Sequence, residues 1–191
     1  MSKRVCKKCV LDSDIPGINI NEETGLCHFC ETYTPLSSQE KNEYLEKIET
    51  LFKEQGGKGN YDVIYALSGG KDSSYTLYKL KKDYPFLKVL AVQFQNGFTS
   101  EGAIKNAKKI CEITGSDYFQ LTMENEILYD VFRKAAESYD AFPKFAKYRA
   151  SDICNTCITI IKQKLIEQAI VQKAPFIMFA FTAGQSPNPI I

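Results

Sequence analysis

A short glycine-rich segment constrains the fold of this chain more than any other feature. Residues 61–67 form an apolar run with β-branched members, which predicts a buried strand. From Ser73 onward, Leu77 and Leu80 recur with lysines between and beyond them, which predicts an amphipathic helix. The glycine-rich segment 68–74 (SGGKDSS) joins the two. A strand, a tight turn and a helix in this order are the unit from which parallel sheets are built.

The segment 68–74 has the composition of a phosphate site. Gly69 and Gly70 allow the backbone to turn sharply and to approach a ligand closely. A helix that begins directly after such a turn presents free N–H groups and the positive end of its dipole. The other members supply hydroxyls, a mobile cation and a carboxylate for Mg²⁺: Ser68, Ser73, Ser74, Lys71 and Asp72. The alternative is a plain turn whose serines cap a helix.

The string SGGKDS lacks the GxxxxGK[ST] spacing of the ordinary P-loop. It closely resembles the pyrophosphate loop of the PP-loop ATP pyrophosphatases, also called adenine nucleotide alpha hydrolases. The resemblance implies cleavage of ATP between the α- and β-phosphates, which adenylates a substrate oxygen that nitrogen or sulfur then displaces. It implies catalytic roles for Lys71 and Asp72, with the phosphates against residues 69–74. It also implies that the adenine lies near Ala66, Leu67, Gln93 and Phe94.

Length and composition indicate an ordinary globular protein. The 191 residues are enough for one full domain and a small module, and 44% are apolar and 25% charged. The net charge of +1 neither favours nor excludes a nucleic-acid partner. No apolar run approaches the roughly 20 residues that span a bilayer, and no hydrophobic region follows the basic start. We therefore expect a cytoplasmic protein with no membrane partner.

Two CxxC pairs near the N-terminus have the spacing of a four-cysteine zinc ribbon. The ligands would be Cys6, Cys9, Cys27 and Cys30. So short and polar a segment does not fold on core burial alone, and a bound Zn²⁺ would supply the missing free energy. Iron, or four free thiols, are the alternatives. His28, the only histidine, is expected to be a bystander rather than a ligand.

The amino-acid sequence of this module also resembles that of a known family. CKKCVLDSDIPGINI followed by TGLCHFC is similar to the N-terminus of the N-acetyl sugar amidotransferases, which are themselves PP-loop proteins. The resemblance covers about the first 35 residues. It implies a sugar acceptor and ammonia from a separate glutaminase.

The rest of the chain predicts an α/β fold. We expect a zinc ribbon over residues 1–35, a linker helix within 36–60 and a PP-loop domain, Rossmann-like and HUP-type, over 61–191. Further strands are predicted at residues 88–94, 118–121 and 176–181, with helices between them, which indicates a parallel sheet. The linker helix is expected to pack its apolar face against the main domain. Its predicted capping box and apolar face comprise Ser37, Glu40, Tyr44, Leu45, Ile48, Leu51 and Phe52.

Single residues are expected to begin, end or fill the later helices. Thr99 or Ser100 is the predicted cap of one helix, which Gly115 ends, and Asn125 is the predicted cap of the next. Cys111 is expected to be a small buried apolar residue.

A third CxxC pair, Cys154 and Cys157, lies at the start of a predicted helix. Such a position favours the thiolate, so the pair is predicted to be reactive or metal-binding, although it is also compatible with two incidental small residues. The pair is similar to that of the PP-loop enzymes that thiolate tRNA, in which a CxxC and a later cysteine hold an iron–sulfur cluster or form a persulfide relay. Here no cysteine follows Cys157, and Gly184-Gln185 stands where those enzymes have Gly-His.

Two further expectations concern the C-terminal half. Residues 142–149 interleave aromatic and basic side chains, which suits the stacking of a base or the binding of phosphates, or a plain surface loop. The sequence ends soon after the last predicted strand, so we expect a sheet that is incomplete unless more chain or a partner completes it.

Together these motifs and the resemblances they carry imply ATP-dependent adenylation of a substrate oxygen followed by sulfur transfer. The predicted cofactors are ATP, Mg²⁺, Zn²⁺ and, at Cys154 and Cys157, an iron–sulfur cluster. The acceptor is a small molecule, a sugar or tRNA, with a sulfur donor or a glutaminase as partner. N-acetyl sugar amidotransfer is the alternative hypothesis. The third hypothesis is a non-catalytic module with a zinc ribbon and a nucleotide-binding domain.

Overall fold

A computed structural model describes residues 3–15, 17–138, 142 and 150–181. The chain divides into two compact units, Met1–Ile48 and Glu49–Ile191. Each unit has its own internal contacts and is described by itself below. In the described part of the chain, no helix has both the length and the apolar character that crossing a membrane requires.

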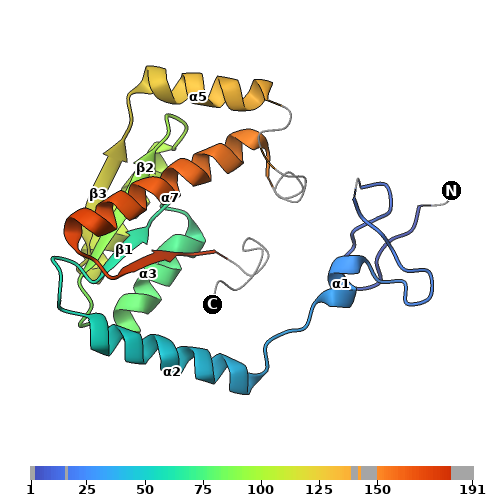
Figure 1. Cartoon of the computed structure of the whole chain (residues 1–191), viewed down its shortest axis with the longest axis horizontal. Coiled ribbons are helices and arrows are strands. Elements are labelled where there is room, and N and C mark those ends of the chain that lie inside the picture. The colour runs from blue at the N-terminus through green and yellow to red at the C-terminus, as the bar shows by residue number, and fades with distance from the viewer. Residues whose placement is uncertain (1–2, 16, 139–141, 143–149, 182–191) are drawn as a thin grey trace. The chain divides into compact units, whose positions relative to one another are not determined.

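The second unit is built on a four-stranded parallel sheet (Figure 1). Its strands are β1 (Val63–Ala66), β2 (Val89–Gln95), β3 (Asp117–Thr122) and β4 (Phe176–Phe179), in the order β3-β2-β1-β4. In the register, Val63 lies opposite both Val89 and Phe176. The predicted α/β class with a parallel sheet is therefore confirmed, and all four strands lie where they were expected to within about two residues.

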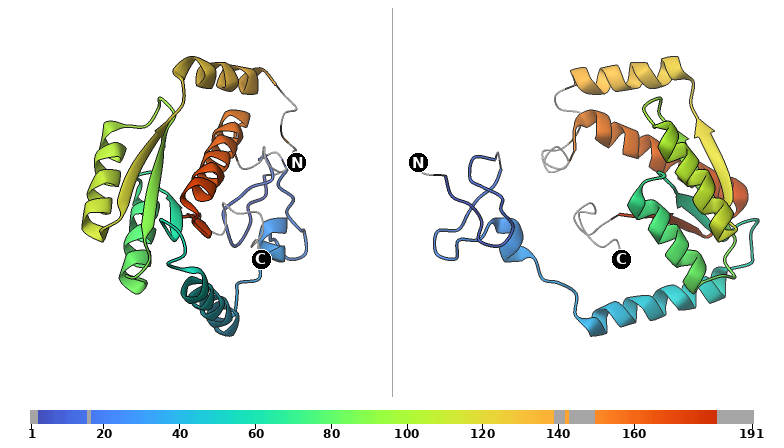
Figure 2. Two further views of the ribbon diagram at one scale, coloured as in Figure 1. Left: turned by 60° about the vertical axis from the view of Figure 1, so that its left-hand side comes forward. Right: turned by 180° about the vertical axis from the view of Figure 1, so that it is seen from behind.

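Helices cover both faces of this sheet (Figure 2). They are α3 (Lys71–Asp83) and α4 (Glu101–Thr114) on one face and α7 (Asp152–Gln172) on the other, and α5 (Asn125–Glu137) packs against α7. Tyr65 of β1 faces a core that includes Leu77 of α3. Its neighbour Ile64 faces the opposite core, which includes Leu165 of α7. Successive strand residues point to opposite faces, so a strand covered on both faces is apolar throughout, as residues 63–67 are.

The helix ends follow the local sequence signals, with one exception. Ser100 caps α4 by accepting a hydrogen bond from the Ala103 N–H at 3.2 Å, and Gly115 ends it in the left-handed conformation at φ +61°. The predicted cap at Asn125 is wrong. Glu124 occupies the N-cap without a side-chain hydrogen bond, and Asn125 is the first residue inside α5. Cys111 is buried, as predicted.

The linker helix α2 (Ser38–Gln55) has the predicted capping box, but not the predicted buried face. The Ser37 N–H and the Glu40 N–H each donate to the side chain of the other residue, at 2.8 and 3.1 Å. Phe52 is buried and stacks edge-on against Phe176 of β4. Of the other residues of the expected face, Tyr44 is half-buried and Leu45, Ile48 and Leu51 are exposed. The apolar period therefore predicted the helix correctly and its burial wrongly.

A buried carboxylate, that of Asp62, joins two loops at the amino-terminal ends of the strands. Asp62, with 2% of its surface exposed, lies just before β1. It accepts hydrogen bonds from the Gly57 N–H at 2.5 Å and from the Lys88 N–H at 2.8 Å. A buried carboxylate that accepts two N–H bonds is satisfied, and it ties the loop after α2 to the start of β2. The opposite, carboxyl edge is left for a ligand.

Candidate functional site

The segment 68–74 forms a closed turn between β1 and α3. The hydroxyls of Ser68 and Ser73 are hydrogen-bonded to each other at 2.9 Å, and the Ser68 N–H donates to the Ser73 Oγ at 3.3 Å. The Gly70 N–H donates to the Ser68 Oγ at 3.3 Å. Gly70 is the N-cap of α3 and offers no side chain. The first N–H groups of a helix have no carbonyl partner within it, so those at the start of α3 are available to an anion.

Gly69 is held in a place that admits no side chain. Its φ is +77°, in the left-handed region. A Cβ atom at this position would overlap the backbone carbonyl oxygen of Ala103, in the first turn of α4. The turn therefore depends on glycine for two separate reasons, its backbone conformation and its contact with a second helix.

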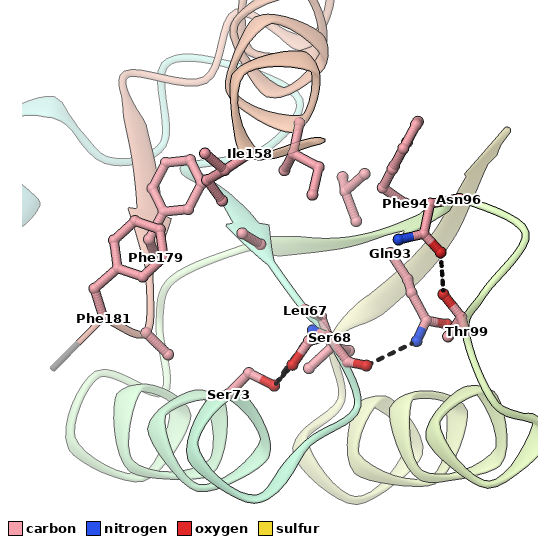
Figure 3. A pocket seen from close by; sticks show the side chains of 14 residues that line it. Leu67, Ser68, Ser73, Gln93, Phe94, Asn96, Thr99, Ile158, Phe179 and Phe181 are labelled. Carbon is pink, nitrogen blue, oxygen red and sulfur yellow. Dashed lines mark hydrogen bonds between the residues drawn. The ribbon is translucent and has the colours of Figure 1, made fainter. Parts of the chain in front are cut away.

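A cavity of about 230 Å³ opens beside this turn, at the carboxyl edge of the sheet (Figure 3). Six of the predicted nucleotide residues line it: Ala66, Leu67, Ser68, Ser73, Gln93 and Phe94. Asn96 and Thr99, from the turn after β2, complete one wall. In open α/β sheets, ligands bind outside the carboxyl ends of the strands, which is where this cavity lies.

The other wall of the cavity is apolar. It is formed by Ile158 and Ile161 of α7 and by Phe179 and Phe181. The two phenylalanine rings are stacked, with centroids 5.1 Å apart and planes inclined by 10°. A flat apolar wall opposite a polar turn suits a ligand with an aromatic ring at one end and anionic groups at the other.

Gln93 contributes to the cavity by holding its wall in place. Its side chain is buried, and its amide donates to the Ser68 carbonyl at 3.1 Å and accepts from the Tyr118 hydroxyl at 2.6 Å. Both ends of the amide are therefore engaged within the protein. Gln93 connects β2 and β3 to the start of the turn formed by residues 68–74.

Lys71 and Asp72 lie in the first turn of α3 and form an ion pair, with Nζ and Oδ1 2.5 Å apart. Their side chains are 87% and 62% exposed, and neither lines the cavity itself. The predicted residues Gly69, Gly70 and Ser74 also belong to the turn rather than to the cavity lining. The turn thus presents a cation, a carboxylate and free N–H groups at one rim of the cavity.

Cys157 lies beside the same cavity. The Asn96 Nδ2 donates to the Cys157 Sγ at 3.7 Å, which joins the turn after β2 to α7. Cys154, one turn earlier in α7, is exposed, and its N–H donates to the capping Ser151 Oγ at 3.2 Å. Within the described residues, no third cysteine, histidine or carboxylate completes a metal site with this pair.

In the first unit, the four N-terminal cysteines form one cluster. The sulfur atoms of Cys6, Cys9, Cys27 and Cys30 all lie within 4.8 Å of one another. The Cys27 N–H and the Lys8 N–H donate to the Cys6 Sγ at 3.2 and 3.5 Å. His28 lies outside the cluster, where its Nδ1 accepts from the Asn19 N–H at 3.4 Å. The short helix α1 (His28–Thr32) carries Cys30.

The cysteines of this cluster differ in the pKa values of their thiols. Hydrogen bonding to Cys9, followed by burial and the other two sulfurs, raises the pKa of Cys30 to about 12. Burial raises the pKa of Cys6, but backbone N–H groups, that of Cys27 first, outweigh it and lower that pKa to about 6. In a tetrahedral site with metal–sulfur bonds of about 2.3 Å, the sulfurs lie about 3.8 Å apart. The Cys9–Cys27 separation of 3.5 Å is close to this value.

Two predicted features lie outside the described residues. One is the aromatic and basic loop, apart from Phe142, and the other is the turn at Gly184-Gln185.

Residues 61–180 match the family model described as the tRNA methyl transferase HUP domain. The chain belongs to this family. It is a PP-loop ATP pyrophosphatase by family, as the SGGKDSS segment predicted, and the family uses ATP. The match begins just before β1 and ends just after β4, so it covers the sheet and the phosphate turn.

The chain is also similar to individual proteins, at low sequence identity. The chain is 33% identical over 136 residues to an uncharacterised protein of Methanocaldococcus jannaschii, covering 70% of this chain and 48% of that protein. Among solved structures, the NH3-dependent NAD synthetase of Campylobacter jejuni is 19% identical, with a TM-score of 0.47, over 74% of this chain and 56% of that one. The U34-tRNA thiolase NcsA of Methanococcus maripaludis, solved with its [4Fe-4S] cluster, is 22% identical, with a TM-score of 0.46, over 94% and 55%. The chain spans about half the length of each.

Proposed function

We propose that this PP-loop protein uses ATP to adenylate an oxygen atom of an acceptor. The observation that carries the proposal is the position of the phosphate turn at the rim of a cavity whose far wall is apolar. The acceptor oxygen attacks the α-phosphorus of ATP, the new O–P bond forms, and the bond to the β-phosphate oxygen breaks. Pyrophosphate leaves, and the acceptor carries AMP.

Each part of the turn has a chemical role in this step. The free N–H groups at the start of α3 bind phosphate oxygens, and the Lys71 ammonium balances their charge. The Asp72 carboxylate is exposed and is a hard oxygen ligand, so it fits Mg²⁺, which supplies charge neutralisation when bound. The adenine packs between Phe94 and the apolar wall formed by Ile158 and Phe179.

Asp72→Ala tests this proposal. We expect turnover to fall about a hundredfold or more, because the metal ligand at the reacting phosphates is lost, while ATP affinity falls much less. Turnover is followed with α-labelled ATP in the presence of small-molecule and tRNA fractions as acceptor sources, and affinity is followed by titration. Asp83→Ala is the matched control, because Asp83 is a carboxylate at the other end of the same helix, paired with Lys79. Release of ADP and phosphate instead of AMP and pyrophosphate would disprove the proposed reaction.

For the second step we propose sulfur transfer through Cys154 and Cys157, supported by the contact of Cys157 with a cavity residue. An external sulfur donor first converts one cysteine to a persulfide. The outer sulfur of this persulfide attacks the acceptor carbon that bears the adenylated oxygen, so that a C–S bond forms and AMP leaves with the oxygen. The second cysteine then breaks the S–S bond, and the resulting disulfide is reduced by an external thiol. An iron–sulfur cluster here would need ligands from outside the described residues.

Cys154→Ala distinguishes sulfur transfer from amide transfer. Amide transfer is the alternative suggested by the resemblance of the N-terminal module to the N-acetyl sugar amidotransferases. If sulfur is transferred, this variant loses thiolated product while ATP binding stays within about twofold, because Cys154 is exposed and lies outside the cavity lining. Thr156→Ala, in the same turn of α7, is the control. Undiminished turnover of Cys154→Ala with ammonium as the only donor would instead establish amidotransfer.

A further inference from the structure

We infer that Asn96 is a positioning residue that holds the Cys157 sulfur at the wall of the nucleotide cavity. The inference rests on the proposed function in two respects, namely that the cavity holds ATP and that the two cysteines transfer sulfur. It adds a difference between the two cysteines: Cys157 carries the sulfur that faces the nucleotide, and Cys154 is the resolving thiol. Asn96 lies 61 residues before Cys157 in the chain, so only the fold brings the two together.

The orientation of the Asn96 amide is fixed by its other partners. Its Oδ1 accepts a hydrogen bond from the Phe98 N–H at 3.0 Å and another from the Thr99 hydroxyl at 3.2 Å. A backbone N–H is only ever a donor, so the atom that faces Phe98 N must be the amide oxygen. The amide nitrogen is therefore directed at the Cys157 sulfur, to which its N–H donates a hydrogen bond.

The turn that carries Asn96 is itself fixed on α5. Gly97 has a φ of +81°, and a Cβ there would lie 2.7 Å from the Tyr129 hydroxyl. The ring of Phe98 lies 6.3 Å, centroid to centroid, from both the Tyr129 and Phe132 rings. The two residues that follow Asn96 thus lie against α5, which restricts the conformation of the turn. A donor on a fixed turn positions its partner more closely than one on a free loop.

The same groups form part of the cavity. Asn96 and Thr99 line it from the turn, and Ile158, the residue directly after Cys157, lines it from α7. A nucleotide in the cavity would therefore contact residues on both sides of the Asn96–Cys157 hydrogen bond. Among the described residues, no side chain donates a hydrogen bond to the Cys154 sulfur, which is exposed, and the Cys154 N–H donates to Ser151. This asymmetry assigns the two cysteines their different roles.

Asn96→Asp is the decisive variant, because it separates positioning from folding. Aspartate keeps the oxygen that accepts from Phe98 and Thr99 and replaces only the donor that faces Cys157. The measurement is the rate of iodoacetamide alkylation of the intact protein, with Cys154 and Cys157 resolved by fragment ions in mass spectrometry. We expect alkylation at Cys157 to slow by about tenfold and that at Cys154 to stay unchanged. Asn106→Asp, the same charge change at an exposed position of α4, controls for net charge and should alter neither rate.

Two further arms complete the test. Asn96→Ala, which removes donor and acceptor without adding a charge, should slow Cys157 less than Asn96→Asp does. In the unsubstituted protein, a non-hydrolysable ATP analogue should slow alkylation of Cys157 more than that of Cys154. Equal Cys157 rates in the unsubstituted protein and Asn96→Asp would overturn the inference. The alkylation contrast needs no turnover, so it stands or falls separately from the proposed adenylation, whose own failure would appear in the Asp72→Ala assay.

Discussion

Gly69→Ala is expected to abolish ATP binding and to destabilise the second unit by about 3 kcal/mol or more. An alanine Cβ would overlap the Ala103 carbonyl oxygen, so α4 must move or the turn must open. The left-handed conformation at φ +77° adds roughly 1–2 kcal/mol for a residue with a side chain. Either movement displaces the N–H groups that we propose bind the phosphates. Denaturant unfolding and ATP titration measure the two effects.

Two other glycines serve as matched controls, because Gly70 lacks both features of Gly69 and Gly115 lacks only the overlap. Gly70 has a φ of −81°, and a Cβ there would contact only the Ser68 hydroxyl, at 3.4 Å. Gly70→Ala should therefore leave stability nearly unchanged. Gly115 has a φ of +61° and nothing within 4 Å of the added Cβ, so Gly115→Ala should show the conformational cost alone. A Gly69→Ala variant no less stable than Gly115→Ala would contradict the proposed overlap with α4.

Cys6→Ser is expected to release the metal that we propose for the N-terminal cluster and to unfold the segment around it. Purified protein should contain about one zinc ion per chain, since four sulfurs within 4.8 Å of one another fit a single tetrahedral ion. In such modules the metal-binding free energy, of order 10 kcal/mol, is the folding free energy. The described residues of the first unit include only two buried apolar side chains, Cys6 and Cys27, which are themselves cluster members. Elemental analysis and hydrogen exchange of residues 3–33 provide the measurement.

Cys154→Ser is the control for the metal, because it changes a cysteine of the second unit. It should leave the zinc content unchanged, and Cys6→Ser should leave the exchange of β1 and β2 unchanged, since the sheet has its own cores. An N-terminal segment that stays protected from exchange without metal would show that it folds by other means. Iron in place of zinc would keep the site and change its ion.

The sequence predicted best where the signal is local. The SGGKDSS turn, the capping box at Ser37 and Glu40, and the cap at Ser100 depend on residues within a few positions of one another. Such contacts form in the same way whatever the rest of the fold does. The alternation of apolar strands with helices likewise predicted the parallel sheet, because only a covered parallel sheet buries apolar strands on both faces.

The apolar period of α2 shows where this reasoning fails. The period predicts an apolar face, but burial requires another element opposite that face. Phe52 finds Phe176 and Tyr84, whereas Leu45 and Leu51 are exposed. The cap expected at Asn125 failed for a different, local reason: α5 begins one residue earlier than expected, with Glu124 at the N-cap.

The sequence by itself thus determined the phosphate turn, the two N-terminal CxxC pairs and the order of strands and helices. Only the tertiary structure decided which backbone carbonyl excludes a side chain at Gly69. It also decided that the Gln93 amide is hydrogen-bonded to Ser68 and Tyr118, and that Asn96 is hydrogen-bonded to Cys157. The physical reason is that these contacts join side chains and backbone groups from different elements. Their distances depend on how helices and strands pack across the sheet, and that packing reflects all the buried faces together rather than any short pattern of residues.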